Sequence, residues 1–439
     1  MKKIGILDYP YIAKSFTGGG GVNSNEIIYR MSKKYDITYF PKINEIYAFL
    51  VNRNHEKINF LRKNINIMEK NNIKVSNGFK SLIYKDIKAN EIKKYLLNSY
   101  INESKNLELL YDNDYSPTMH PFFLNKGEIM YMSDSNKIGF GITLRGFSDI
   151  NNYNDFKLIN LILKYNKNLE KKTLIKIISF TFHPYFDSYL IMNIIKNKNL
   201  KFLGIVNNSI IYYNTRLNKI SKKIYLLYPA DASRFHCSYF TKDDYLLFYA
   251  RLVPEKGLYE IALIINELKK KNIFIKTKIA GKFINENDKT VFYNLLKFYN
   301  IQNYVEFVGF LRDEDLQPLI EKAKILLYPS HSDAYSMVII ESLSLKTQVI
   351  TYNIPSLYNL YKNMPSINFV KEYDVYKFAN KIIDLLNEES EKYYSKFEDD
   401  ITKKLIKDHS SYDLVFNVTT KMMDEYFLHS PIVKYQEGR

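Results

Sequence analysis

Short apolar runs of strand length alternate with helix-like segments along most of this chain of 439 residues. Such alternation is typical of parallel sheets that are covered by helices on both faces, so we predict an α/β protein. In the first half, strands are expected near Lys3–Asp8, Asp36–Phe40, Glu108–Tyr111, Ile138–Leu144 and Phe202–Val206. In the second half, they are expected near Tyr245–Ala250, Ile273–Ala280, Val305–Val308, Ile325–Tyr328, Gln348–Tyr352 and Ile367–Val370. Helices are expected at Leu258–Lys269, Val291–Tyr299, Leu316–Ala323, Met337–Leu345 and Val375–Leu386.

The length permits two domains of about 200 residues each, and a hydrophobic content of 46% is enough for two cores. The break is expected at Asn214–Thr241, where helix-like periodicity gives way to Pro229, Asp231 and a run of polar residues. We therefore predict an N-terminal domain at residues 1–225, a C-terminal domain at residues 226–410, and a C-terminal helix and tail at residues 411–439.

Cysteine usage and hydropathy bear on the compartment. Cys237 is the only cysteine, which excludes an internal disulfide and gives no hint of a cysteine metal cluster. No apolar stretch reaches the roughly 18 residues of a membrane-spanning helix, and Asp8 and Pro10 interrupt the first apolar run. We expect a cytoplasmic protein, and any contact with a membrane would be made from the surface.

The net charge of +16 lies in one half of the chain. Residues 1–250 hold 37 Lys and Arg against 21 Asp and Glu, whereas residues 251–439 hold 26 of each kind. Basic and apolar residues interleave from Tyr47 to Tyr100. This pattern fits amphipathic helices on the anionic inner face of a membrane, and it also fits ordinary helices with one buried stripe. Nucleic acid is not an expected partner, because the basic half lacks a known reader motif.

Three strings in the second half place opposite charges at predicted strand-to-helix turns. YARLVPEKG (249–257) carries Arg251 and Lys256, VEFVGFL (305–311) is a further strand, and PSHSDAYSMVIIESLSLKTQVI (329–350) carries Asp333 and Glu341. Two cations at one turn and two acids at the next but one suit a ligand with an anionic diphosphate and polyhydroxyl ends. The strings therefore indicate a sugar-nucleotide site.

A glycine run, residues 18–21, follows the first predicted strand and leads into a helix. Glycine lets the backbone approach a ligand closely, and a helix N-terminus attracts anions. The run has neither the GxGxxG nor the Walker pattern, so a kinase or ATPase is not favoured. It is interpreted as a phosphate-facing loop, with a flexible turn as the alternative.

In combination, these strings resemble the GT-B glycosyltransferases, specifically the retaining family 4, or glycosyl transferases group 1. ARLVPEKG, VEFVGFL and DAYSMVIIESLSLKTQVI stand in the family's order and spacing, and LYPADASRF (227–235) resembles its linker. The resemblance is strongest over roughly residues 225–355. It implies two Rossmann-like domains that face each other across a cleft, with a C-terminal helix returning to the N-terminal domain. It also implies transfer of a sugar from a nucleotide-sugar donor to a glycan or lipid-linked acceptor, with retention of anomeric configuration.

The resemblance assigns a role to each matching residue. Arg251 and Lys256 would hold the diphosphate and neutralise the leaving group. Glu341 would bind the ribose hydroxyls, and Asp333 would bind hydroxyls of the donor sugar. Other donor contacts would come from the amides of Ala334, Tyr335 and Ser336, from Gly281 and Gly309 at the base, and from Gly19, Gly20 and Gly21 at the phosphates. The alternatives are solvated cations at a helix entry and an Asp333 that only caps a helix.

Some positions depart from the family pattern. Asp333 is one methylene shorter than the usual glutamate, and Ala334 and Ser336 replace glycines, so the donor sugar stays open. Where many relatives carry a histidine, the string TLRG places Arg145, which becomes the catalytic candidate there. The alternative candidates are His120 and His183.

We expect no cofactor and no metal, because the family's cations and helix N-termini supply the positive field. Two DxD-like strings, at residues 112–114 and 313–315, are weak metal candidates. Two rival functions stay open: a non-catalytic GT-B protein that binds a nucleotide sugar, and another GT-B enzyme such as a nucleotide-sugar epimerase.

Overall fold

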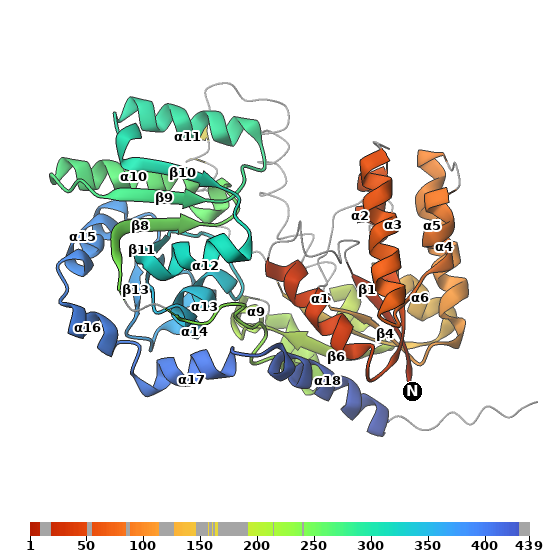
Figure 1. Ribbon diagram of the computed structural model, residues 1–439. Helices are drawn as coiled ribbons and strands as arrows, with labels where there is room; N and C mark the ends of the chain where they lie inside the picture. Colours follow the sequence, from red (N-terminus) through yellow and green to blue (C-terminus); the bar gives the residue numbers. More distant parts are fainter. Residues whose placement is uncertain are drawn as a thin grey trace, which may run out of the picture.

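Two parallel sheets, one in each half of the chain, organise the protein (Figure 1). The computed structural model describes residues 1–8, 19–50, 55–84, 88–113, 127–145, 157, 160, 163–165, 192–213, 215–238 and 241–429. Within these residues, the first sheet has seven strands in the order β3-β2-β1-β4-β5-β6-β7, and the second has six in the order β10-β9-β8-β11-β12-β13. Neighbouring strands pair in parallel throughout. The predicted α/β class with two parallel-sheet domains is confirmed.

The first sheet consists of β1 (Lys3–Asp8), β2 (Asp36–Pro41), β3 (Lys74–Val75), β4 (Leu109–Asp112), β5 (Gly139–Leu144), β6 (Leu200–Ile205) and β7 (Ile224–Leu226). The helices of this half are α1 (Gly19–Met31), α2 (Ile43–Leu50), α3 (His55–Lys70), α4 (Asn77–Tyr84), α5 (Ala89–Glu103), α6 (Glu128–Asn136) and α9 (Ser209–Tyr213). β7 lies inside the stretch that was predicted as linker, so the linker proper begins after this edge strand.

The second sheet consists of β8 (Asp243–Tyr249), β9 (Lys276–Ala280), β10 (Val305–Gly309), β11 (Ala323–Tyr328), β12 (Gln348–Tyr352) and β13 (Ile367–Val370). Its helices are α10 (Leu258–Lys270), α11 (Glu286–Phe298), α12 (Asp313–Lys322), α13 (Met337–Ser344), α14 (Pro355–Tyr361), α15 (Val375–Leu386), α16 (Ser390–Ser395) and α17 (Asp400–Asp408). α11 begins earlier than predicted, because the Asn285 side chain caps it by accepting from the amide of Asp288.

Each sheet reverses its direction of growth once. The reversal lies between β1 and β4 in the first sheet and between β8 and β11 in the second. Ligands of such sheets bind beyond the carboxyl ends of the strands at this reversal. In the second sheet those ends are Tyr249 and Tyr328, directly before the two predicted charged turns.

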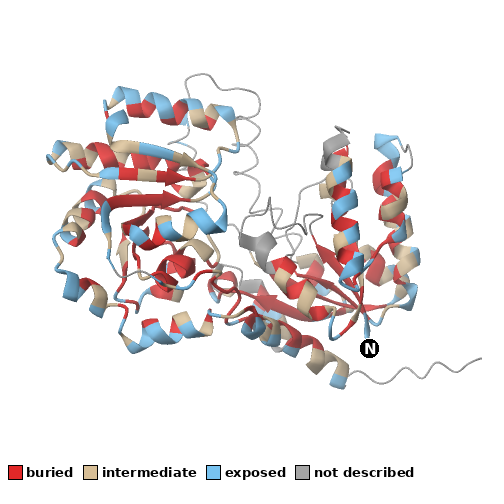
Figure 2. Ribbon diagram, in the orientation of Figure 1, coloured by how far each residue is buried: buried red, intermediate tan, exposed pale blue. Residues whose placement is uncertain are grey.

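The central strands of both sheets are buried between helices (Figure 2), whereas the edge strands β7 and β10 are partly exposed. All residues of β5 and β12 are buried, as expected where helices cover both faces. The helices of the basic region also use their apolar stripes inside the domain. Buried side chains of α3, α4 and α5 include Leu61, Ile65, Met68, Phe79, Leu82, Ile83, Ile92, Leu96 and Tyr100. This packing agrees with ordinary helices that have one buried stripe.

The last described helix, α18 (Tyr412–His429), runs from the C-terminal half to the N-terminal domain (Figure 1). Arg30 of α1 forms an ion pair with Asp413 at 2.6 Å. The Tyr35 hydroxyl donates to Asp424 at 2.8 Å, and the Tyr35 ring lies 6.3 Å from that of Phe427. The expected return of the C-terminal helix is confirmed. Among the described residues, no helix combines the length and apolar character needed to cross a membrane.

Candidate functional site

The turn after β8 carries the two predicted cations against the loop that follows β11. Gly257, with a φ of 82°, ends the short helical turn Pro254–Lys256 and leads into α10. A Cβ added at Gly257 would lie 2.2 Å from the carbonyl oxygen of Pro329, so only glycine permits this approach. The two turns that the sequence predicted to share a site are therefore in backbone contact.

Lys256 and Asp333 meet where these turns touch. The Lys256 ammonium lies 3.0 Å from Asp333 Oδ2 and donates to the carbonyl oxygen of Ser332 at 2.6 Å. The Tyr328 hydroxyl also donates to Asp333 Oδ2. Burial would raise the pKa of Asp333, but Lys256 and Tyr328 hold it below its ordinary value. Burial would lower the pKa of Lys256, yet Asp333 raises it, so the site holds a charged pair.

Asp333 also fixes the turn that leads into the helix carrying the second acid. Its Oδ1 accepts from the amides of Ala334 and Ser336, at 2.9 and 3.1 Å. The Ser336 side chain then accepts from the amide of Ile339, which starts α13. Asp333 thus has contacts as the partner of a donor-site cation, whereas the cap of α13 is Ser336, so the alternative of an Asp333 that only caps a helix is wrong. Two of the three amides expected to face the donor bind the Asp333 carboxylate.

Glu341 is held by an arginine that the motif comparison did not single out. The carboxylate is only 2% exposed, and its Oε1 accepts from Arg234 Nε at 2.8 Å and Nη2 at 2.7 Å. Oε2 accepts from the Tyr249 hydroxyl at 3.2 Å. Arg234 also contacts Asp313 at 2.6 Å. Burial raises the pKa of Glu341, although Arg234 acts in the opposite direction.

A sequence signal for this partner exists but is incomplete. A carboxylate on the buried face of a helix requires a cation, and none of the residues one turn away on α13 is basic. Arg234 lies 107 positions earlier, in the segment LYPADASRF. The need for a partner could be predicted, whereas the choice of Arg234 could not.

The two glycines predicted at the base pocket lie side by side at the ends of β9 and β10. The amide of Gly281 donates to the carbonyl oxygen of Gly309 at 2.8 Å. A Cβ at Gly281 would lie 2.0 Å from the carbonyl oxygen of Ala250, whereas no atom lies within 4 Å of the Cβ position at Gly309. The backbone of Gly309 therefore faces open space, and its neighbour Phe310 is 68% exposed.

The remaining predicted residues lie on the facing domain or near the linker. Gly19 to Gly21 form the first turn of α1 rather than a loop before it, and Gly18 lies outside the described residues. Arg145 donates to the carbonyl oxygens of Asn113, at 3.1 Å, and Ala230, at 3.0 Å. It thus joins the N-terminal sheet to the linker. His120, His183 and Asp114 lie outside the described residues.

The Arg251 side chain and the acids of the DxD-like strings differ in whether they form ion pairs. Within the described part of the chain, the exposed Arg251 side chain makes no recorded hydrogen bond or ion pair. Asp112 pairs with Lys42 at 3.1 Å, and Asp313 pairs with Arg234. No three His, Cys, Asp or Glu side chains among the described residues are grouped to hold a metal ion.

The turn after Asp333 also ties the two halves of the chain together. Asn207, just beyond β6, donates to the carbonyl oxygen of Ala334 at 3.1 Å. The Tyr335 hydroxyl accepts from the amide of Ala230 at 3.3 Å and lies 2.7 Å from His409 Nε2. His409 Nδ1 donates to the Leu405 carbonyl, so Nε2 is the acceptor. Burial lowers the pKa of His409 to about 4, so this ring is neutral near pH 7.

Comparison with known proteins finds a family model that is similar to part of the chain. Residues 231–404 match the family model described as glycosyl transferases group 1. The O-antigen biosynthesis glycosyltransferase WclY of Escherichia coli is 29% identical over 172 residues, which are 38% of this chain and 45% of that protein. The chain thus spans less than half of the length of the curated relatives it matches.

Solved structures extend the likeness to the whole chain. Sucrose-phosphate synthase from Thermosynechococcus elongatus has a TM-score of 0.66 at 11% identity, with 98% of this chain and 100% of that chain covered. HepE from Anabaena, in complex with UDP and glucose, has a TM-score of 0.63 at 11% identity, with 97% and 100% covered. Identities this low show a shared fold alone. The chain therefore has the GT-B fold, and its residues 231–404 are similar to the glycosyl transferases of group 1.

Proposed function

We propose that this protein transfers a sugar from a nucleotide-sugar donor to an acceptor, with retention of anomeric configuration. The observation that carries the proposal is the contact of Lys256 with Asp333 beyond the carboxyl ends of β8 and β11. A sheet of this topology binds its ligand at that point. In this proposal, residues 226–410 bind the donor, residues 1–225 bind the acceptor, and no metal or cofactor takes part.

The charges of the site suggest how the donor would be held. The charge of Lys256 is balanced by Asp333, whereas Arg251 is exposed. An incoming diphosphate would bind both cations and draw Lys256 away from Asp333. The carboxylate of Asp333 would then accept hydrogen bonds from the sugar hydroxyls. Glu341 would bind the ribose through Oε2, which keeps a second lone pair beside the Tyr249 hydroxyl, whereas Oε1 already accepts twice from Arg234.

Catalysis would rest on placement and charge. Arg251 and Lys256 would stabilise the departing nucleotide diphosphate. That phosphate would help to deprotonate the acceptor hydroxyl on the same face of the sugar, which gives retention. Further contacts are proposed for the amides of Ala334, Tyr335 and Ser336, for Gly281 and Gly309 at the base, for Gly19, Gly20 and Gly21 at the phosphates, and for Arg145 near the reacting sugar.

The test is a panel of UDP-, GDP-, ADP- and TDP-sugars, starting with UDP-glucose because HepE was solved with UDP and glucose. A bound donor raises the melting temperature by mass action, and a transferase slowly releases nucleotide diphosphate from it. Lys256→Ala and Glu341→Ala should abolish both effects. Lys392→Ala is the matched control, because that side chain is 74% exposed on α16.

Two outcomes would contradict the proposal. Binding without any turnover, with or without candidate acceptors, would favour a non-catalytic nucleotide-sugar-binding protein. Interconversion of the bound sugar would favour an epimerase. For a transferase, NMR of the product gives the anomeric configuration, and an inverted product would refute retention.

A glycan or lipid-linked acceptor is proposed, in keeping with the O-antigen biosynthesis named for WclY. Because the apolar stripes of α3, α4 and α5 are buried, the proposed membrane contact would be electrostatic rather than inserted. Anionic vesicles should bind the protein in low salt and release it in high salt. Equal binding to neutral vesicles would exclude this contact.

A further inference from the structure

A buried histidine lies directly before the Asp333 turn and has no part in the proposed chemistry. His331 is 6% exposed, in the loop that follows β11. Its Nε2 lies 2.6 Å from Glu260 Oε1 on α10. Its Nδ1 lies 2.8 Å from Glu372 Oε1, in the loop between β13 and α15. One imidazole thus joins three segments that are distant in sequence.

The partners determine the charge of the ring. Ionised carboxylates only accept hydrogen bonds, so an imidazole that bonds one at each nitrogen must carry a proton on both. Burial would lower the pKa of His331, but Glu260 and Glu372 raise it to about 9. His331 is therefore an imidazolium at neutral pH. The Tyr373 ring stacks on it, with centroids 4.4 Å apart and planes at 19°.

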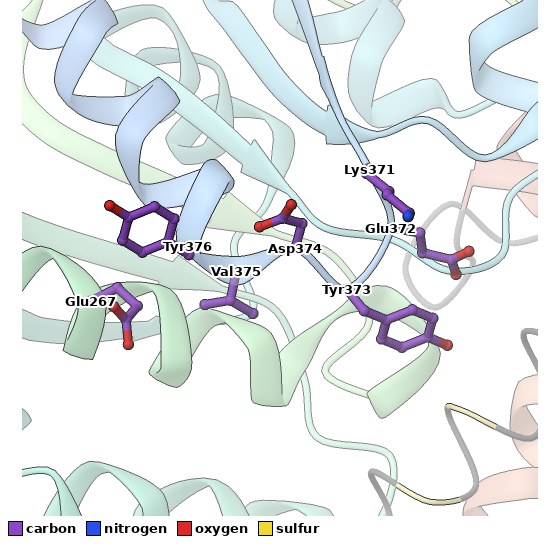
Figure 3. A pocket seen from close by; sticks show the side chains of 7 residues that line it. All are labelled: Glu267, Lys371, Glu372, Tyr373, Asp374, Val375 and Tyr376. Atoms are coloured by element: carbon purple, nitrogen blue, oxygen red, sulfur yellow. The ribbon is translucent and has the colours of Figure 1, made fainter.

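Further aromatic and charged side chains lie near the His331 ring. The Tyr352 ring of β12 lies 5.3 Å from the His331 ring, and Lys157 lies 5.6 Å from the centre of the Tyr373 ring. Glu372 and Tyr373 also line a surface pocket with Glu267 (Figure 3). Solvent can therefore reach the Glu372 side of the cluster, whereas Glu260 is 1% exposed.

The same loop holds the turn that carries Lys256. The amide of His331 donates to the carbonyl oxygen of Glu255 at 3.0 Å, one residue before Lys256. The Lys256 ammonium in turn binds the Ser332 carbonyl and the Asp333 carboxylate. The His331 side chain is thus the anchor of a short segment that also binds the Glu255 carbonyl and Lys256.

We propose that His331 is a positioning residue of the donor site, whose imidazolium, bound between Glu260 and Glu372, holds Asp333 in register with Lys256. The inference rests on the proposed function for its catalytic consequence. Loss of the ring charge would leave two carboxylates facing one neutral imidazole, and the loop would move away from α10. Donor binding should therefore weaken as pH rises through the His331 transition, near pH 9.

The first test is the charge state itself. Nitrogen-15 NMR of the histidine-labelled full chain should show a ring protonated at both nitrogens at pH 7.5, with a resonance that His331→Gln removes. A neutral His331 ring at pH 7.5 would overturn the proposal. Glu372→Gln should lower the pH midpoint of this resonance, because one stabilising carboxylate is lost, and an unchanged midpoint would also contradict it.

The second test measures donor binding. His331→Gln should raise the donor KM at pH 7.5 by about tenfold with a smaller effect on kcat, since misplacing a group by about 1 Å costs up to about 100-fold. The KM of the wild type should rise above about pH 9, whereas that of His331→Gln should not rise further there. His236→Gln is the matched control, because His236 is exposed. Equal donor KM values for the wild type and His331→Gln would refute the positioning role.

The two hypotheses can fail separately. If the wild type binds no sugar nucleotide, the proposed function fails, and the anchor is then judged by hydrogen exchange at a fixed pH of 7.5. Amides of residues 329–336 should exchange faster in His331→Gln than in the wild type. Equal exchange rates would overturn the anchor itself.

Discussion

The ion pair between Arg234 and Glu341 should respond asymmetrically to the loss of either partner. Arg234→Met removes the cation and leaves a 2% exposed carboxylate with only the Tyr249 hydroxyl as partner. Leaving a buried charge unpaired costs about 3–5 kcal/mol. Glu341→Gln removes the charge instead, and Arg234 keeps Asp313 and partial access to water. That change should cost only about 1–2 kcal/mol.

The pH dependence tests the same reasoning. Burial already raises the pKa of Glu341, and removal of Arg234 would raise it further. The folded Arg234→Met variant would then bind a proton that the unfolded chain releases near its ordinary pKa of about 4.3. Because the folded state binds more protons, its stability falls as pH rises. The deficit of Arg234→Met should be largest at pH 8 and smaller at pH 5.5.

Urea unfolding followed by circular dichroism at both pH values measures these differences. Arg312→Met, an exposed arginine one residue before Asp313, serves as the control and should change stability by less than about 0.5 kcal/mol. The double variant should cost less than the sum of the single changes. Equal costs for Arg234→Met and Glu341→Gln, or a deficit that does not change with pH, would refute the argument.

Two further predictions concern the backbone at Gly281 and the contacts of Tyr335 between the two halves of the chain. Gly281→Ala should lower the melting temperature strongly, because the φ of 144° and the carbonyl oxygen of Ala250 both oppose a Cβ. Gly309→Ala should cost only about 1–2 kcal/mol, because its φ is 79° and its Cβ would lie in open space. Equal melting temperatures for the two variants would contradict the contact at Ala250. Tyr335→Phe should lower the free energy of unfolding by about 1–2 kcal/mol, because the Ala230 amide and His409 each lose a hydrogen bond. This cost should be constant from pH 6 to 8, where His409 stays neutral. A cost that varies over this range would indicate a charged His409 ring.

Local sequence patterns predicted most of the fold. A strand and the helix after it each leave their own periodicity over a few residues, and the order of these elements predicted parallel sheets covered by helices. The resemblance of the strings in 225–355 to a known family added the GT-B arrangement, and the structure confirms both. The exceptions are the short β3 and β7, since two or three residues leave no pattern. The turns that carry Lys256 and Asp333 were also predictable, because each follows directly after a strand of the same sheet.

Only the tertiary structure decided which charged side chains pair with each other. Glu341 requires a cation wherever it is buried, but the choice of Arg234 depends on how the linker folds back over α13. His331 lies two positions from Asp333, yet its charge follows from Glu260 and Glu372, which are 71 residues before it and 41 after it. Sequence by itself determined the order of the elements and their turns, because those preferences are local. The charge pairing was decided by distances across the fold, which no local pattern records.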